Sequence, residues 1–542
     1  MNAPLPDTAL TPATPTRLMT GEQYVESLRA LKPVVYVDGR RVASVADEPA
    51  LAPGVRAMAF TYDAALRPEW APLMTQHQRA TGRTVNRMLA VDDSAGDLLN
   101  KLEAVRLLCQ ETGCAQRYLA HDGLAALGQM AQRLDDHHGS GREHRDRFTA
   151  YLDHVQANDL TLGIAMTDAK GDRSRRAHEQ ANPDTHVHIV ERNARGIVIS
   201  GTKAIVTGAP YMHEFLVTPH RNLVEADAAF AVCCAVPVDA PGLTIVSRPA
   251  GRPGDKLEHG AALFSRRYGQ ATGVLIFDRV AVPWERVFLA GQWAQAGPLV
   301  TDYATHHRHT CIAARAGFGD LLIGAGALMC EANGFDDPGQ VSSLREPMVE
   351  LIKIVEGFYA CGVAASVYGS ADSSGIFMPE PVYANIGKLL LATQIYDMHR
   401  LAHEVSGGLI VTLPGPDEDH NPATAATLAE VLRANPAVPY DKRIQTARFI
   451  EDLTASYQAG WYSVISLHGG GSPAAMKQEI WRRYPLGSKV ELVERLLDRG
   501  VLAPDPARPI TQNRQPGRCC DSGCSAPGQP VMVSLPGRSE AE

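Results

Sequence analysis

The spacing of apolar residues changes twice along the chain, and this change constrains the fold more than any other feature of the sequence. Apolar side chains recur with the helical period over 97–134 and 141–158. Between 186 and 288 the pattern changes to short runs rich in β-branched residues, separated by Gly, Pro, Asn and Asp, as in an antiparallel sheet. The helical period returns after about residue 300. This order predicts an α+β protein in which a β unit lies between N-terminal helices and a helical bundle.

Capping signals and composition place the boundaries of these parts. The first helix is expected to start after Thr20, because Thr20 and Gln23 have the spacing of a capping box. In the bundle, Leu351, Ile354 and Phe358 mark one buried stripe. We expect five parts: a flexible arm at 1–17, an N-terminal helical domain at 18–158, a middle antiparallel β domain at 159–292, a C-terminal helical bundle at 293–505 and a cysteine-containing tail at 506–542.

The charge balance excludes several classes of partner. The 542 residues include 52 Lys and Arg against 60 Asp and Glu, for a net charge of −8, without a block of five or more consecutive basic residues. Binding to nucleic acid and a polybasic membrane anchor are therefore not expected. The sequence shows no secretory signal and no long uninterrupted apolar stretch, so we expect a cytoplasmic protein without a membrane span. In that reducing compartment the 10 cysteines are expected to be thiols, metal ligands or catalytic groups.

Two turns that contain glycine are candidates for binding an anion. The turn Thr167–Arg173 (TDAKGDR) offers backbone N–H groups beside Lys170 and Arg173, which suits a phosphate-bearing cofactor at a domain boundary. A charged surface turn is the alternative. In the segment His468–Pro473 (HGGGSP), three glycines allow backbone amides to approach an anion closely. A helix end followed by a turn explains this second segment equally well.

Ionisable side chains gather beside the apolar sequence AGFGDLLIGAG. On a helix, His307 and Cys311 are four residues apart and share a face. The imidazoles of this cluster suit general acid–base steps, and structural roles for the histidines are the alternative. The cluster consists of Tyr303, His306, His307, Arg308, His309, Cys311 and Arg315.

The cysteines give weak signals for a metal. Cys109 and Cys114 form one pair, but no second pair at metal-ligand spacing accompanies them. In the tail, Cys519, Cys520 and Cys524 could bind zinc or iron, or form only an exposed redox-sensitive group. We therefore predict no metal site and keep the three tail cysteines as weak candidates.

Several stretches together resemble one family, the flavin-dependent 4-hydroxyphenylacetate 3-hydroxylase family, which includes the 4-hydroxybutyryl-CoA dehydratases. The resemblance covers about nine-tenths of the chain, and the dehydratase-like branch is the more similar one. The stretches are TGEQYVESLR (20–29), MTDAKGDRS (166–174), GIVISGTKAIVTGAP (196–210), VAVPWERVF (280–288), GFGDLLIGAGAL (317–328), SGGLIVTLP (406–414) and SLHGGGSP (466–473).

The resemblance implies an acyl-CoA-dehydrogenase-like fold: N-terminal helices, a middle antiparallel β domain and a C-terminal four-helix bundle. It also implies a homotetramer or a dimer of dimers, with FAD bound where the domains meet. By position, the residues that would contact FAD are Ile164, Ala165, Met166, Thr167, Lys170, Gly171, Asp172, Arg173, Thr207, Gly469, Gly470, Gly471 and Ser472.

The resemblance further implies, for the dehydratases, a [4Fe–4S] cluster held by three cysteines and one histidine. The four matching positions are Cys114, Tyr118, His307 and Ala314. Tyr118 and Ala314 cannot supply thiolate ligands, so a cluster is not expected. Cys109 and Cys311 lie nearby in sequence and could substitute with a shifted geometry.

The hydroxylase branch is also matched in part. The resemblance implies that an arginine, a tyrosine and a histidine hold the substrate phenol, and these fall at Cys114, Tyr118 and Ile164. Only the tyrosine is kept, so 4-hydroxyphenylacetate itself is not the expected substrate.

We therefore predict a flavin-dependent monooxygenase that takes reduced FAD (FADH2) from a separate flavin reductase and hydroxylates a phenolic or similar small molecule. His307 or His121 would act as the base, Tyr118 or Arg117 would orient the substrate oxygen, and Arg308 is the remaining catalytic candidate. One alternative is a lyase or isomerase like 4-hydroxybutyryl-CoA dehydratase, which uses FAD with an altered or absent cluster. Another is an inactive homologue that serves as an assembly partner, although the intact flavin-contact turns argue against it.

Overall fold

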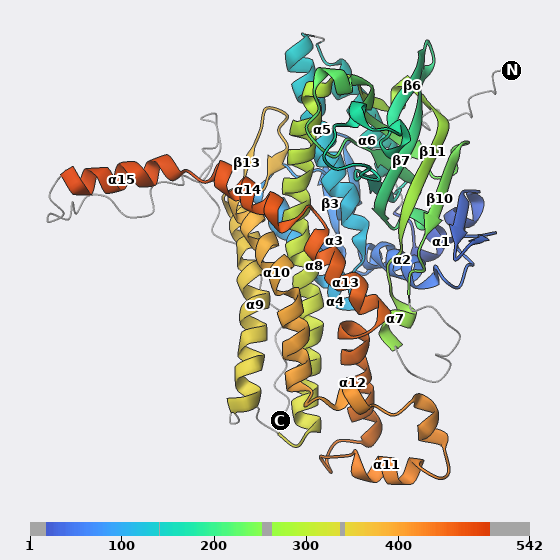
Figure 1. The fold of residues 1–542 in the computed structure, drawn as a ribbon, viewed down its shortest axis with the longest axis vertical. Helices are drawn as coiled ribbons and strands as arrows, with labels where there is room; N and C mark the ends of the chain where they lie inside the picture. The colour runs from blue at the N-terminus through green and yellow to red at the C-terminus, as the bar shows by residue number, and fades with distance from the viewer. Residues whose placement is uncertain (1–17, 140, 252–262, 336–341, 499–542) are drawn as a thin grey trace. The chain divides into compact units, whose positions relative to one another are not determined.

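The structure is a computed structural model, and it describes residues 18–139, 141–251, 263–335 and 342–498 (Figure 1). Two compact units divide the chain, Met1–Leu486 and Gly487–Glu542. In the second unit the described residues belong to α15 (Leu486–Asp498). The predicted arm at 1–17 and the predicted tail at 506–542, with Cys519, Cys520 and Cys524, lie outside the described residues.

The first N-terminal helix begins at the predicted capping signal. The capping box is present: Gln23 N donates to Thr20 Oγ1 (3.1 Å) and Thr20 N donates to Gln23 Oε1 (2.9 Å). The predicted helical stretch 97–134 is two helices, because Gly113 ends the first with a φ of +70°. The helices are α1 (Gly21–Ala30), α2 (Ala52–Leu66), α3 (Ala71–Met74), α4 (Ala95–Thr112), α5 (Leu119–His138) and α6 (Glu143–Ala157).

The middle of the chain forms two sheets. A six-stranded sheet has the order β2-β1-β10-β11-β7-β6, and a four-stranded sheet has the order β12-β9-β8-β5. Two small hairpins, β3–β4 and β13–β14, lie apart from them. The strands are β1 (Val34–Val37), β2 (Arg40–Arg41), β3 (Thr75–Gln78), β4 (Arg83–Asn86), β5 (Leu162–Ala165), β6 (His188–Asn193), β7 (Gly196–Thr207), β8 (Glu214–Val217), β9 (Val232–Pro237), β10 (Leu243–Ser247), β11 (Thr272–Pro283), β12 (Val287–Ala290), β13 (Ser370–Ala371) and β14 (Phe377–Met378).

Two strand pairs are parallel, which corrects the prediction of a purely antiparallel β domain. β1 pairs with β10, with Val34 opposite Thr244, and β5 pairs with β8, with Leu162 opposite Glu214. Parallel neighbours require long connections, and the partners of both pairs are far apart in sequence. Since β1 comes from the predicted N-terminal helical domain, the sheet extends beyond the boundary that we predicted at residue 159.

The C-terminal part contains three long helices that pack side by side, α8, α9 and α10 (Figure 1). The predicted helix 441–467 is two helices, α12 and α13, because Ser456 caps the second by accepting from Ala459 N at 3.2 Å. The helices are α7 (Leu263–Arg267), α8 (Ala296–Ala332), α9 (Ser342–Val367), α10 (Pro381–Val405), α11 (Ala425–Val431), α12 (Tyr440–Thr454), α13 (Tyr457–His468) and α14 (Pro473–Arg483).

The segment Trp293–Ala332, which contains α8, is long and apolar enough to cross a membrane by length and composition alone. Within the described fold, however, 67% of its most apolar window is buried. Helices from the core of globular proteins pass the same test, and α8 packs against α4, α5, α9, α10 and α12. We interpret α8 as the central core helix of the bundle.

The helix α5 joins the sheets to the bundle. It packs against α8 on one side and against β5 on the other. Gly123 permits the close approach to β5, because a Cβ at this position would lie 2.5 Å from Ile164 Cδ1. The start of α5 is thereby placed between the sheet layer and the long helices, where the candidate site lies.

Candidate active site

A cavity lies where the start of α5, the end of β7, α8, α10 and the end of α13 meet. Its wall is formed by Tyr118, Leu119, Thr207, His307, Cys311, Ala314, Arg315, Lys388, Leu391, Ile465, Ser466 and Gly469. Parts of all three predicted domains therefore contribute to one site. The cavity volume is about 30 Å³, which suits a water molecule. A larger ligand requires the surrounding side chains to move apart.

Three side chains form a row from the cavity wall into α5. Cys311 Sγ lies 3.4 Å from His307 Nε2, and His307 Nδ1 lies 3.1 Å from Asp122 Oδ2. The spacing of four residues on α8 places Cys311 beside His307, whereas Asp122 comes from α5. Thr310 Oγ1 donates to Asp122 Oδ1 at 2.8 Å, which holds the carboxylate against α8.

The row favours the charged form of each of its members. Burial would lower the pKa of His307, but the adjacent Cys311 thiolate and Asp122 raise it to about 10. Burial would raise the pKa of Cys311, but the His307 imidazolium lowers it below its ordinary value. Burial would likewise raise the pKa of Asp122, but hydrogen bonds from His121 and His307 hold it well below its usual range. The contacts within the row therefore favour a thiolate, an imidazolium and a carboxylate.

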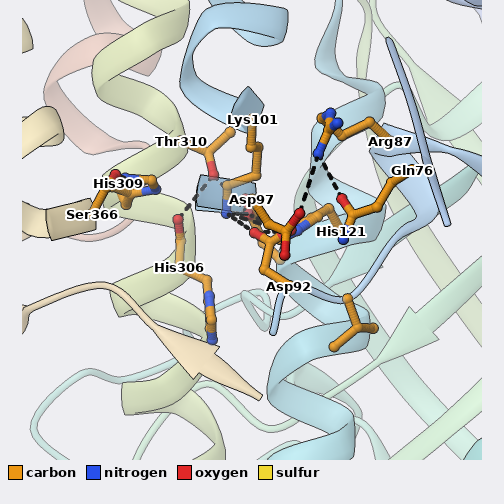
Figure 2. A network of polar contacts seen from close by, with 12 residues as sticks. Gln76, Arg87, Asp92, Asp97, Lys101, His121, His306, His309, Thr310 and Ser366 are labelled. Carbon is orange, nitrogen blue, oxygen red and sulfur yellow. Dashed lines mark hydrogen bonds and ion pairs between the residues drawn. The ribbon is translucent and has the colours of Figure 1, made fainter. Parts of the chain in front are cut away.

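A network of buried charges lies behind this row (Figure 2). His121 Nε2 lies 2.9 Å from Asp92 Oδ2, and Lys101 Nζ lies 3.5 Å from Asp92 Oδ2 and 4.0 Å from Asp122 Oδ1. The side chains of these four residues are fully buried. Asp92 and Lys101 carry opposite charges, and the two carboxylates favour the protonated form of His121, whose pKa rises although burial opposes it. Each carboxylate thus faces cations, as a buried charge requires.

Two of the histidines that the sequence groups with His307 point elsewhere. His306 Nε2 lies 3.1 Å from Gln129 Oε1, and His309 Nε2 lies 2.8 Å from Ser366 Oγ (Figure 2). Burial lowers the pKa of His306 to about 3, so the imidazole is neutral at ordinary pH. These two side chains have structural partners and do not line the cavity.

Two buried cations complete the cavity wall. Lys388 Nζ donates to Ser466 O at 2.6 Å, and burial lowers the pKa of Lys388 to about 8. Arg315 Nε donates to Ser466 Oγ at 2.5 Å, but its Nη1 is buried and lacks a hydrogen-bond partner within the part of the chain that the structure describes. Leaving a buried donor unpaired is costly. Arg315 Nη1 therefore marks a position where an oxygen atom of a ligand or water would bind.

The predicted glycine turn reaches the cavity at Gly469. Gly470 and Gly471 have φ values of +76° and +104°, which other residues rarely adopt. A Cβ at Gly470 would lie 3.3 Å from His307 Cδ2, and a Cβ at Gly471 would lie 3.0 Å from Arg308 Nη2. Side chains at these two positions would therefore crowd His307 and Arg308.

Arg308, one of the predicted catalytic residues, holds this turn in place. Its Nε donates to Gly470 O at 2.8 Å, and its Nη1 donates to Asn385 Oδ1 at 2.6 Å. Ser472 caps α14 by accepting from Ala475 N at 3.3 Å. The turn, the Thr207 hydroxyl and Arg315 Nη1 form a donor set that suits the polar edge of a flavin ring.

The predicted flavin segment Ile164–Arg173 runs from a buried strand to solvent. Ile164 and Ala165 end β5, Met166 O accepts from Lys203 Nζ (2.8 Å), and Thr167 O accepts from Ala204 N (2.7 Å). The residues from Lys170 to Arg173 form a turn, in which Gly171, Asp172 and Arg173 are exposed. Of the predicted flavin contacts, Thr207 and Gly469 line the cavity, and the exposed turn does not.

The other four predicted catalytic residues occupy three different places. Tyr118 and His307 share the cavity wall, with ring centroids 6.2 Å apart. His121 lies in the buried charge network behind them. Arg117 is buried elsewhere, where its Nη2 lies 2.5 Å from Asp159 Oδ1 and its guanidinium lies 3.6 Å from the Tyr62 ring centroid.

The donor set does not fit a [4Fe–4S] cluster at the four positions that the resemblance implies. Tyr118 and Ala314 line the cavity beside His307, and neither offers a thiolate. The Cys114 thiol interacts with that of Cys109, and this hydrogen bond together with burial raises the pKa of Cys109 well above its ordinary value. A buried neutral thiol is a poor metal ligand.

Asp122, Lys388 and Ser466 were not predicted as catalytic or cofactor-binding residues. Asp122 and Lys388 are charged residues inside the apolar stretches LAHDGLAAL and NIGKLLLAT, and this isolation is a usable signal for a buried ion. Ser466, which accepts from Arg315 and Lys388 through its hydroxyl and its carbonyl oxygen, gives no such signal.

A second group of potential metal ligands lies in the β domain, where donor atoms of Asp168, His186 and His220 come within 4.8 Å of one another. Lys203 Nζ, however, lies 2.6 Å from Asp168 Oδ1, and His220 Nδ1 lies 2.5 Å from Asp168 Oδ2. The ammonium group already neutralises the carboxylate, so we interpret this group as a structural ion-pair cluster.

Comparisons with known proteins relate nearly the whole chain to flavin enzymes. The chain is 33% identical over 488 residues to the 4-hydroxybutyryl-CoA dehydratase/vinylacetyl-CoA-Δ-isomerase of Clostridium aminobutyricum, covering 88% of this chain and 99% of that one. It is 25% identical to the oxygenase component of 4-hydroxyphenylacetate 3-monooxygenase from Thermus thermophilus, covering 86% and 94% of the two chains.

Solved structures show the same two branches. An oxygen-tolerant archaeal 4-hydroxybutyryl-CoA dehydratase from N. maritimus superposes with a TM-score of 0.84 at 33% identity, covering 91% of this chain and 97% of that one. The oxygenase component of 4-hydroxyphenylacetate 3-monooxygenase in complex with FAD has a TM-score of 0.78 at 23% identity, covering 89% and 99%. The fold is acyl-CoA-dehydrogenase-like, as predicted.

Two family models match consecutive parts of the chain. The N-terminal model of 4-hydroxyphenylacetate 3-hydroxylase matches residues 20–289, and the C-terminal model matches residues 296–498. The chain therefore belongs to the 4-hydroxyphenylacetate 3-hydroxylase family, whose members include FAD-dependent monooxygenases and 4-hydroxybutyryl-CoA dehydratases.

Proposed function

We propose that this protein is the oxygenase component of a two-component, FADH2-dependent monooxygenase that hydroxylates a small phenolic or similarly electron-rich substrate. The observation that carries the proposal is the cavity wall, which combines the hydroxyl of Tyr118 with His307 and the unpaired Nη1 of Arg315. At two of the four positions where the dehydratase branch implies cluster ligands, the chain has Tyr118 and Ala314.

Different residues of the chain would bind the cofactor and the substrate. Thr207 and the turn Gly469–Ser472 would hold FAD at the cavity. Reduced FAD, when bound, would activate dioxygen for transfer to an electron-rich carbon. Tyr118 and His307 would bind the phenolic oxygen from one side. Because the pKa of His307 is about 10, this side chain would hold its proton at neutral pH and stabilise a phenolate as a neighbouring cation rather than act as a base.

The test supplies the purified chain with FAD, NADH and a flavin reductase in air, together with a panel of substituted phenols. We expect a hydroxylated product that contains oxygen from labelled dioxygen. Tyr118→Phe is expected to lower the rate of product formation about tenfold or more with little change in FAD affinity, since one substrate hydrogen bond is lost. The exposed Tyr396→Phe is the matched control. NADH oxidation that yields only hydrogen peroxide with every phenol would refute the proposal.

A redox-neutral lyase or isomerase acting on an acyl-CoA is the second candidate. It is favoured by the 33% identity to the clostridial dehydratase over 88% of the chain. Cys109 and Cys311 would then have to replace the missing cluster ligands. Conversion of 4-hydroxybutyryl-CoA without dioxygen, by protein that contains iron and acid-labile sulfide, would establish this function in place of hydroxylation.

We also propose two kinds of partner. The oxygenase components among its relatives support a separate flavin reductase as the source of FADH2. A homotetramer or a dimer of dimers is supported by exposed apolar side chains on the bundle, such as Val349, Val464 and Trp481, which is 74% exposed. Sedimentation velocity of the full chain tests the assembly, and a monomer at micromolar concentration would contradict it.

A further inference from the structure

We propose that Cys311 is a nucleophilic thiolate that forms a covalent bond with α,β-unsaturated carbonyl compounds entering the cavity, with His307 as the proton donor. This inference does not rest on the proposed monooxygenase function. It assigns chemistry to a side chain that oxygen transfer does not use.

The geometry is that of an activated nucleophile. Cys311 Sγ is 3.4 Å from His307 Nε2, and Asp122 Oδ2, 3.1 Å from His307 Nδ1, fixes the orientation of the imidazole. A nucleophile, an adjacent acid–base group and a third group that orients it are the elements that generate reactive cysteines in enzymes. Asp122 acts here as a positioning residue, because it reaches the thiolate only through His307.

The other described cysteines lack this arrangement. Cys109, Cys114, Cys233, Cys234 and Cys330 are buried. Cys361 on α9 is partly accessible, as Cys311 is, but its Sγ contacts the carbonyl oxygen of Gly357 at 3.6 Å. Burial raises the pKa of Cys361, whereas the pKa of Cys311 is lowered. Cys361 therefore serves as the matched internal control.

The surrounding groups indicate the class of ligand. A thiolate is a soft nucleophile, and Lys388 and Arg315 line the same cavity, the latter with its unpaired Nη1. These cations suit a carbonyl oxygen that gains negative charge during the reaction. A conjugated carbonyl compound combines an electron-poor carbon for the sulfur with such an oxygen.

The step is balanced without an oxidant or reductant. The lone pair of Cys311 Sγ forms a bond to the β-carbon, and the electrons of the carbon–carbon double bond move toward the carbonyl to give an enolate. His307 then transfers its Nε2 proton to the α-carbon, which leaves a thioether and a neutral imidazole. The reverse elimination returns the proton to His307 and releases the unsaturated compound.

The experiment treats the full chain with acrylamide at pH 7 and measures the alkylation rate of each cysteine by peptide mass spectrometry. We expect Cys311 to react about tenfold faster than Cys361, because an ordinary thiol is only a few per cent ionised at this pH. His307→Gln and Asp122→Asn should slow Cys311 severalfold and leave Cys361 unchanged. A Cys311 rate no higher than that of Cys361, or one insensitive to His307→Gln, would overturn the proposal.

Two further arms keep the outcome interpretable. The buried Cys233 reports on folding, since it reacts only if the fold opens; a variant with an unchanged Cys233 rate is folded. Saturation with FAD before alkylation is expected to protect Cys311, because Thr207 and Gly469 line the same cavity. Fast alkylation of Cys311 without protection by FAD would support the nucleophile and contradict the proposed flavin site.

Discussion

Removing the Lys101 ammonium group tests whether the buried charge network stabilises the fold. Lys101 Nζ lies 3.5 Å from Asp92 and 4.0 Å from Asp122, so with an effective dielectric constant of about 20 the two attractions are about 5 and about 4 kcal/mol. Part of this attraction offsets the cost of burying the ammonium group, which is several kcal/mol. Lys101→Met leaves two buried carboxylates facing fewer cations, and we expect a loss of about 3–5 kcal/mol in the free energy of unfolding.

The assay is urea denaturation of wild type and variant at pH 7, with the midpoints compared because a chain of this size need not unfold in two states. The exposed Lys353→Met, in a helix-surface ion pair, is the matched control and is expected to leave the midpoint nearly unchanged. The double variant Lys101→Met/Asp92→Asn should recover part of the loss, because it removes one charge of each sign.

The pH dependence gives a second readout. In wild type, nearby cations hold the pKa of Asp92 well below its usual value, although burial opposes this. Without Lys101 the folded-state pKa of Asp92 rises, so the folded variant binds a proton as the pH falls. The difference in unfolding midpoint between wild type and Lys101→Met therefore becomes smaller on acidification. We would consider the reasoning refuted if Lys101→Met had the same unfolding midpoint as Lys353→Met, or if the difference in midpoint between wild type and Lys101→Met did not depend on pH.

Three further predictions concern the glycine turn, the buried His213 and Arg117. Gly471→Ala is expected to weaken FAD binding about tenfold in a fluorescence titration, because the φ of Gly471 is +104° and a Cβ there would lie 3.0 Å from Arg308 Nη2. The control is Gly460→Ala, which has open space for its Cβ and should bind FAD normally. Burial lowers the pKa of His213 to about 4, against about 6.5 in an unfolded chain, so the unfolded state binds more protons between these values and stability falls as the pH drops through them. His213→Gln should flatten that dependence of the unfolding midpoint, and an unchanged slope would contradict the assignment. Arg117→Gln is expected to lower the free energy of unfolding by about 3–5 kcal/mol, because it leaves the buried Asp159 carboxylate without its cation and with Met19 N as its remaining donor among the described residues. The exposed Arg79→Gln should leave the unfolding midpoint unchanged, and equal midpoints for the two variants would show that the buried pair contributes nothing.

The helices and their order could be predicted because their signals are local. The Thr20–Gln23 capping box and the helical period after residue 300 each depend on residues within one or two turns. Parallel pairing of β1 with β10 could not be predicted, because it joins Val34 to Thr244 across some 200 residues and no short-range pattern encodes it. Similarly, α2 was not predicted, because its alanine-rich sequence shows only a weak contrast between an apolar and a polar face.

The site was predictable to the extent that its parts share a helix. The spacing of His307 and Cys311 gave their contact, since residues four apart on a helix are neighbours. The contact of His307 with Asp122 spans 185 positions, so the sequence could supply Asp122 only as an isolated charge in an apolar stretch. Arg117 was predicted to orient the substrate because it is next to site residues in the sequence. Its neighbours Tyr118 and His121 do face the site or its charge network, but the Arg117 side chain pairs with Asp159.

The charge balance of the row bears directly on the two candidate functions. A cluster ligated by His307 requires a neutral imidazole nitrogen, yet here His307 is paired on both sides, by Cys311 and by Asp122, and these anions keep it protonated. Releasing that proton would leave the Cys311 thiolate and Asp122 without the cation between them. The buried charges of the row are therefore compensated by the chain's own residues, which favours the cluster-free oxygenase. The opposite result would be protein purified without oxygen that carries four iron and four acid-labile sulfide per chain. A cluster would then bind at the row in place of these charge contacts, and the dehydratase-like lyase would be the better assignment.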